Sequence, residues 1–187
     1  LSFYVKGNAS ATYTVEIRDL DNDRINTQTF AVTTSWNRIS LTFIPDTTGA
    51  FDDDNAGSLQ LSFWLHAGST YTSGTFASNT WASRVQGNRV NSSQTSFFDS
   101  TDRTFFITGI QLEVGSVATP FEHESFAETV QKCKRYYQKS YNLDTFAGAT
   151  VASSQYLAQR FNSADRYFVF NKSFPVEMRN TPTLVVY

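Results

Sequence analysis

Apolar and polar residues alternate with a period of two through most of the first two-thirds of the chain, and this alternation constrains the fold most. Tyr13, Val15 and Ile17, for example, are separated by polar residues, so one face of the segment is apolar. Strands of this kind place one face on a core and the other towards solvent, as in antiparallel sheets. We therefore predict an all-β fold, with a jelly-roll-like antiparallel β-sandwich over residues 1–117. The predicted core takes apolar side chains from each strand: Phe3, Val15, Ile17, Ile39, Leu41, Phe43, Leu61, Phe63, Ile110 and Leu112.

The composition agrees with a β-rich globular fold. The 187 residues include 17 Phe and 9 Tyr but only one Met, and 40% are hydrophobic, which suffices for a core without disulfides or metal. The net charge of −2 gives no indication of nucleic acid or an anionic membrane as a partner. Cys133 is the only cysteine, and no segment approaches the ~20 apolar residues of a membrane span. Because both ends lie inside strand-like runs, we expect the chain to be an internal part of a longer polypeptide.

The alternation is interrupted within the predicted sandwich, and the periodicity changes after it. Residues 67–102 are rich in Gly, Ser, Thr and Asn, which predicts a long loop region. Further on, apolar residues recur at spacings of four, three and four, the stripe of an amphipathic helix: Phe126, Val130, Cys133 and Tyr137.

Ser125 and Glu128 have the spacing of a capping box at the start of this helix. We expect the helix to run from about Ser125 to Ser140, with Cys133 buried as a small hydrophobic side chain. It forms most of a connector over residues 118–142, and residues 143–187 should begin a second small β unit.

Several strings in the chain resemble one family of proteins. Residues 106–116 read Phe-Ile-Thr-Gly-Ile-Gln-Leu-Glu-Val-Gly-Ser, residues 118–123 read Ala-Thr-Pro-Phe-Glu-His, and residues 133–139 read Cys-Lys-Arg-Tyr-Tyr-Gln-Lys. Together they resemble the junction in bacteriophage virion proteins at which a carbohydrate-binding-module-like jelly roll is followed by a short helix and a further β domain. Similar strings upstream and downstream extend the resemblance over nearly the whole chain: residues 1–6, 36–43, 46–51, 174–179 and 181–183.

This resemblance implies a tail-fibre or head-fibre protein located in the virion, with other virion proteins as partners. It also implies a scaffold like that of sugar-binding modules.

No pattern in the sequence predicts catalysis. The two histidines, His66 and His123, have neither a nucleophile nor a paired metal-ligand spacing nearby, so we expect no enzymatic activity and no cofactor. Asp52, Asp53 and Asp54, and separately the Asp residues between 19 and 23, offer the oxygen ligands that Ca²⁺ prefers. Neither loop has the complete calcium-loop pattern, and a solvated turn is the alternative interpretation.

A host-surface glycan is a candidate ligand. Trp64 and His66 alternate with the apolar residues of their strand, and a flat aromatic ring beside polar groups suits a pyranose. Gln111 and Glu113 occupy the corresponding face of the last strand, and Tyr71 and Trp81 lie in the long loop. The alternatives are that the loop or a neighbouring subunit covers Trp64, and that the loop aromatics only anchor the loop.

The end of the predicted helix carries more aromatic side chains than one stripe buries: Tyr136, Tyr137, Tyr141 and Phe146. We expect them to make subunit contacts, and the resemblance to fibrous proteins suggests a homotrimer. The alternative is that the C-terminal unit covers them within one chain. Two functions therefore remain open, a structural fibre or decoration module of the virion and a module that recognises host glycans.

Overall fold

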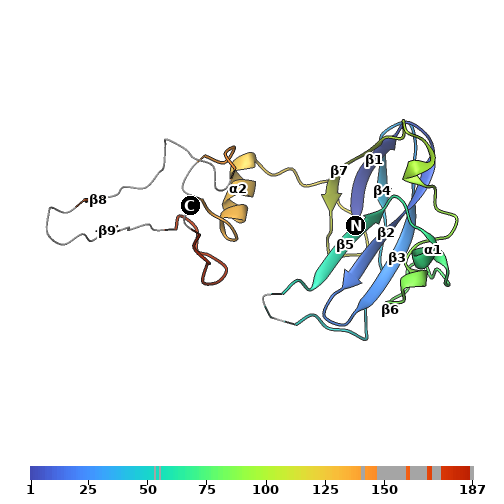
Figure 1. Ribbon diagram of the computed structural model, residues 1–187, viewed down its shortest axis with the longest axis horizontal. Helices are drawn as coiled ribbons and strands as arrows, with labels where there is room; N and C mark the ends of the chain where they lie inside the picture. Colours follow the sequence, from blue (N-terminus) through green and yellow to red (C-terminus); the bar gives the residue numbers. More distant parts are fainter. Residues whose placement is uncertain are drawn as a thin grey trace. The chain divides into compact units, whose positions relative to one another are not determined.

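The computed structural model describes residues 1–52, 54, 56–139, 142–146, 159–160, 168–169 and 174–185 (Figure 1). The chain divides into two compact units, Leu1–Glu122 and His123–Tyr187. The first unit contains the sandwich and the segment that follows its last strand, and the second contains the helix predicted from the change of periodicity.

The first unit consists of two antiparallel sheets, as the alternation predicts. One sheet has the order β4-β1-β7 and the other the order β5-β2-β3-β6. The strands are β1 (Ser2–Gly7), β2 (Ala11–Asp19), β3 (Arg24–Val32), β4 (Asn37–Ser40), β5 (Leu59–Trp64), β6 (Ala82–Ser83) and β7 (Phe105–Gln111). Strands β2 and β3 form a hairpin whose tip carries Asp and Asn residues, which favour turns by bonding to their own backbone. The prediction of an all-β, sandwich-like fold is confirmed.

The core lies between the inner faces of the two sheets. Phe3 and Val15 are fully buried and Ile17 is nearly so, while the ring of Phe3 meets those of Phe30 and Phe63 edge to face at 5.2 and 5.1 Å. Most of the remaining predicted core residues are partly buried against this cluster: Ile39, Leu41, Phe43, Leu61 and Phe63. Edge-to-face contacts add specific geometry to the burial of apolar area, so the aromatic-rich composition stabilises this core directly.

The prediction that Ile110 and Leu112 belong to the core is wrong, because 44% and 49% of their surfaces are exposed. Phe105 and Ile107 instead pack against the core. Strand β7 begins with two consecutive phenylalanines, so the alternation allows either face of the strand to point inward. The register of β7 with β1 decides which face does. Ile107 pairs with Val5, which points inward, whereas Ile110 and Leu112 lie at the end of an edge strand where little covers them.

The pairing of β7 with β1 slips by one residue at Gly109. Tyr4 is paired with Thr108 but Ser2 with Gln111, and Gly109 has a φ of +58°, a left-handed conformation that favours glycine. A methyl group at Gly109 would also lie 3.1 Å from Cδ2 of Tyr4 and 3.6 Å from Cδ2 of Phe121. Because Gly109 has no side chain, Phe121 has room to pack on the sheet at the bulge.

A charged pair ties the end of the β2–β3 hairpin to the segment after β4. Arg24 donates two hydrogen bonds to Asp46, from Nε at 2.6 Å and from Nη2 at 3.1 Å. The Arg24 guanidinium holds the pKa of the Asp46 carboxyl below its usual value. Further along the same segment, Asn22 donates to the carbonyl of Ala50 at 2.9 Å, which adds a second link.

Short helical segments interrupt the polar loop region of the first unit. They are α1 (Ser69–Thr72) and two 3₁₀ turns, η1 (Gln86–Asn88) and η2 (Phe97–Asp99). The loop is attached to the second sheet, because the N–H of Thr95 donates to the carbonyl of Thr12 and the N–H of Phe97 to that of Leu65.

The second unit begins with helix α2 (Phe126–Lys134), and its described strands are β8 (Gln159–Arg160) and β9 (Phe168–Val169). The predicted capping box is confirmed, since the Ser125 hydroxyl accepts from the N–H of Glu128 and the Glu128 carboxylate accepts from the N–H of Ser125. The predicted end at Ser140 is wrong. The helix stops at Lys134, where the N–H of Tyr136 bonds back to the carbonyl of Cys133 in a tight final turn.

The residues after α2 contact the segment 174–180 of the same unit. Gln138 donates to the carbonyl of Val176 at 3.2 Å, and the N–H of Arg179 donates to the carbonyl of Arg135 at 3.0 Å. None of the described helices is long and apolar enough to cross a membrane.

Candidate functional site

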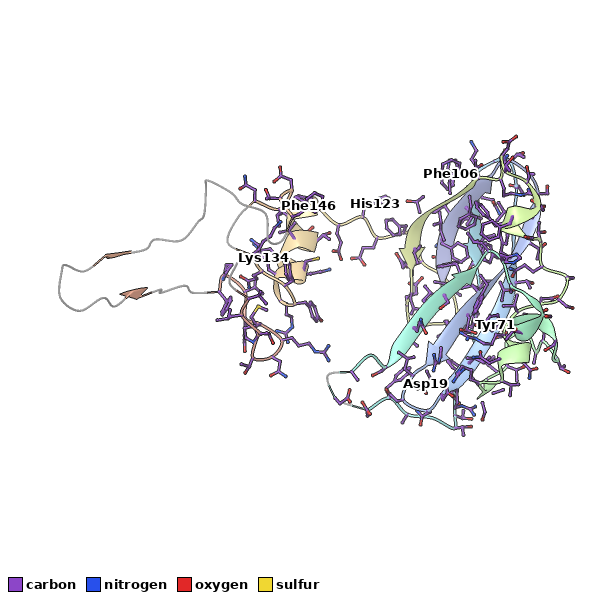
Figure 2. All side chains as sticks on the ribbon, viewed as in Figure 1. Asp19, Tyr71, Phe106, His123, Lys134 and Phe146 are labelled. Carbon is purple, nitrogen blue, oxygen red and sulfur yellow. The ribbon has the colours of Figure 1, made fainter. Side chains whose placement is uncertain are left out.

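The outer face of the second sheet carries a cluster of charged and aromatic side chains that includes two of the predicted glycan contacts. Glu16 lies on the outer face of β2. Trp64 lies on the same face of the neighbouring strand β5, where it pairs with Thr14, two residues before Glu16. The loop region supplies Tyr71 from α1 (labelled in Figure 2) and Arg89 just after η1. The rings of Trp64 and Tyr71 lie 5.0 Å apart, so two of the predicted glycan contacts come together here.

Arg89 occupies the centre of this cluster. Its Nε and Nη2 donate to the two carboxylate oxygens of Glu16 at 2.8 and 2.6 Å, and Glu16 has no exposed surface. The guanidinium carbon lies 4.8 Å from the centroid of the Trp64 ring and 5.7 Å from that of Tyr71. The face of Trp64 on which a sugar would stack is thus in contact with arginine.

This arrangement matches the alternative in which the loop region covers Trp64. Sequence analysis missed Arg89 because it lies 73 residues from Glu16 in a polar segment. A buried carboxylate needs a partner, so Glu16 would have pointed to an arginine had its burial been evident. Its position on the polar face of an alternating strand predicted exposure instead.

Trp81 and His66 lie elsewhere in the first unit. Trp81 donates from Nε1 to the carbonyl of Ile44 at 2.7 Å, and the N–H of Ile44 donates to the side chain of Asn79. These bonds fasten residues beside β6 to the segment after β4, so Trp81 anchors the loop region. His66 is exposed, its Nδ1 lies 2.9 Å from the Ser96 hydroxyl, and its ring meets that of Phe98.

Gln111 and Glu113 lie close to each other but are engaged by the segment that follows them. Glu113 accepts hydrogen bonds from the N–H and the hydroxyl of Thr119 at 2.9 and 2.7 Å, which lower the pKa of its carboxyl. Gln111 donates to the Thr119 hydroxyl and accepts from the N–H of Glu122, both at 2.8 Å. The Thr-Pro-Phe-Glu string at residues 119–122 therefore folds back over the first sheet.

The six predicted glycan contacts consequently do not form one site. They divide into the Trp64–Tyr71 pair, the Gln111–Glu113 pair, and the two separate positions His66 and Trp81. In this unit the polar atoms that a sugar would need are largely bonded to other parts of the chain.

The predicted calcium ligands act as acceptors within turns. Asp52 donates its N–H to Asp21 at 3.1 Å and accepts from the N–H of Asp54 at 3.3 Å, while Asp54 accepts from the N–H of Ala56 at 2.6 Å. Asp53 lies outside the described residues. Among the residues that the structure describes, no three His, Cys, Asp or Glu side chains form a group that could hold a metal ion.

The described aromatic side chains that directly follow α2 are mostly exposed. Tyr136 and Tyr137 are 64% and 59% exposed, Phe146 is 87% exposed, and Tyr141 lies outside the described residues. Helix α2 has no buried residue. The prediction that Cys133 packs in a core is wrong, since Cys133 is exposed, as are Phe126 and Tyr137 of the same stripe, whereas Val130 is half-buried.

A scan against models of protein families gives no match for this chain, and searches of curated proteins and of solved structures give none either.

Proposed function

We propose that the chain is a non-catalytic structural module of a bacteriophage particle, a fibre or decoration segment that assembles as a homotrimer through its second unit. In this proposal the first unit is a jelly-roll-like sandwich of the kind found in tail fibres and head fibres. Other virion proteins are its partners. The observation that carries the proposal is the uncovered apolar surface of α2 and of the residues that follow it.

A helix as short as α2 is only marginally stable on its own, because it has few hydrogen bonds to offset the cost of nucleation. Stability must come from packing of its apolar stripe. Phe126 is nevertheless 77% exposed and Tyr137 59% exposed, at opposite ends of that stripe. Copies of the same segment, related by symmetry, would cover these side chains.

The engagement of polar side chains in the first unit supports a mechanical role. Glu16 is paired with Arg89, Asp46 with Arg24, and Glu113 with Thr119. Each pair connects segments that are far apart in sequence or closes the junction after β7. A unit held together in this way resists deformation, which suits a module that projects from a particle.

Recognition of a host-surface glycan is the second candidate function, and it is compatible with a place in a fibre. The predicted contacts do not favour it, because Arg89 covers Trp64 and Thr119 engages Gln111 and Glu113. The outer face of the first sheet is a different surface, and its features favour recognition of a glycan.

The mass of the protein in solution tests the proposal. Light scattering during size-exclusion chromatography should give three times the subunit mass, which for this chain alone is 21.0 kDa. The trimer should persist on dilution to low micromolar concentration if several aromatic side chains per subunit are buried at ~25 cal/mol per Å². A monomeric mass at every concentration would contradict the proposal.

A further inference from the structure

The outer face of the β4-β1-β7 sheet has two parts that differ in exposure. Near Ser2, which is fully buried, the segment around Thr119 covers the sheet. Arg38 donates both to the Ser2 hydroxyl and to the carbonyl of Thr119, which holds that segment in place. In the other part of the face, around Lys6, the side chains are half-buried or exposed.

Two aromatic rings meet over this open part. Trp36 precedes β4, and Phe106 lies in β7 opposite Lys6 of β1, so the two residues come from the flanks of the central strand. Their ring centroids are 6.5 Å apart at an interplanar angle of 56°. Half of each side chain remains exposed, 50% for Trp36 and 52% for Phe106, and Figure 2 shows Phe106 at the periphery of the sandwich.

Because the consecutive phenylalanines at positions 105 and 106 fit either face of their strand, the sequence does not single out this pair. Their exposure follows from the register of β7, which turns Phe105 inward and therefore Phe106 outward. Two large aromatic side chains held in contact yet half open to solvent are a feature that packing of the sandwich does not require.

Two basic side chains, Lys6 and Arg38, lie on this face of the sheet, and β1, β4 and β7 contain no acidic residue. Lys6 makes no hydrogen bond or ion pair with any residue that the structure describes, whereas the other basic side chains of the sheets, Arg18, Arg24 and Arg38, are all bonded. The chain as a whole is slightly acidic, at −2, so the positive charge is local.

We propose that Trp36, Phe106 and Lys6 form a binding surface for an oligosaccharide that carries carboxylates, such as a uronic-acid-containing glycan. The aromatic pair offers faces for the C–H side of a pyranose, and Lys6, which pairs with Phe106 on the central strand, supplies an ammonium group to bind the carboxylate. Arg38 adds a second positive charge on the neighbouring strand. The inference rests on the second candidate function above, recognition of a glycan, to which it assigns a surface and a class of ligand, and it does not depend on the trimer.

A titration followed by calorimetry tests the proposal. The ligands are tetragalacturonate, tetramannuronate and a hyaluronan tetrasaccharide, with cellotetraose as the neutral comparison. At least one uronate ligand should bind, more tightly than cellotetraose and less tightly as salt is added, because exposed charges are screened. Trp36→Ala and Phe106→Ala should each weaken that binding about tenfold or more, as expected for loss of a stacking residue.

Lys6→Gln should weaken uronate binding, whereas Lys6→Arg should retain most of it. Phe98→Ala is the matched control, since Phe98 is 75% exposed in the same unit but lies beside His66. Its affinity should be unchanged, and thermal unfolding should show that all variants remain folded. The proposal is overturned if no uronate ligand binds, if cellotetraose binds equally well, or if the Trp36 and Phe106 variants bind like Phe98→Ala. None of these results bears on the mass of the assembly in solution, so they can be distinguished from a failure of the structural role.

Discussion

Replacing Arg89 with alanine should lower the free energy of unfolding of the first unit by about 3–5 kcal/mol, the cost of breaking a buried ion pair from one side. The substitution leaves the carboxylate of Glu16 without exposed surface and without its two hydrogen bonds. It also removes the guanidinium that lies against the rings of Trp64 and Tyr71. We expect the loop region to detach from the second sheet before the sheets themselves separate.

Unfolding in guanidinium chloride, followed by tryptophan fluorescence, measures this effect. All three tryptophans lie in the first unit, so the signal reports that unit alone. Arg84→Ala is the control, because its partner Asp23 is half exposed and also binds Arg18. An exposed pair of this kind contributes little to stability, so Arg84→Ala should shift the unfolding midpoint much less than Arg89→Ala.

A double variant separates the charge from the packing. Glu16→Leu combined with Arg89→Leu should be more stable than Arg89→Ala alone, because no charge is then left buried without a partner. If Arg89→Ala instead unfolds at the same guanidinium concentration as Arg84→Ala, the pair does not hold the loop region on the sheet. In that case the covering of Trp64 would need another explanation.

The second large effect concerns assembly. Tyr137→Asp combined with Phe146→Asp should convert the trimer to monomers. Both side chains are mostly exposed in the chain, so charge is tolerated in the isolated subunit but not in an apolar contact between subunits. Both substitutions lie in the second unit, so the fluorescence-detected unfolding of the first unit should remain the same.

Light scattering measures the mass of this double variant in the longest form of the protein that can be purified. Phe98→Asp is the matched control, since it places the same charge at an exposed phenylalanine of the first unit. The control should remain trimeric. A double variant that stays folded and trimeric would show that α2 and the residues after it are only a linker, and that the subunits meet elsewhere.

Periodicity predicted the architecture well where one face of a strand is clearly apolar. Tyr13, Val15 and Ile17 of β2 point inward as expected, and the capping box at Ser125 marks the start of α2. Periodicity failed at β7, where consecutive phenylalanines fit both faces and only the pairing with β1 decides. It also placed the end of α2 too late, since a tight turn at Tyr136 interrupts the helix while the apolar spacing continues.

The candidate sites were less predictable than the fold, for a physical reason. Trp64, Gln111 and Glu113 were correctly assigned to polar faces, but whether such a face is open depends on segments that fold onto it. Arg89 and Thr119 supply that cover, from positions that the strand pattern does not connect with these faces. Conversely, Trp36 and Phe106 became visible as an exposed pair only once the register of their strands was known.

Cryo-electron microscopy of the phage particle that contains this protein tests the central proposal most directly. We predict density for the two-sheet unit in a projection from the particle, repeated three times about the axis of that projection, with the residues after α2 at the contact between copies. Particles in which no such density is found, although the protein is produced during infection, would contradict a structural role in the virion.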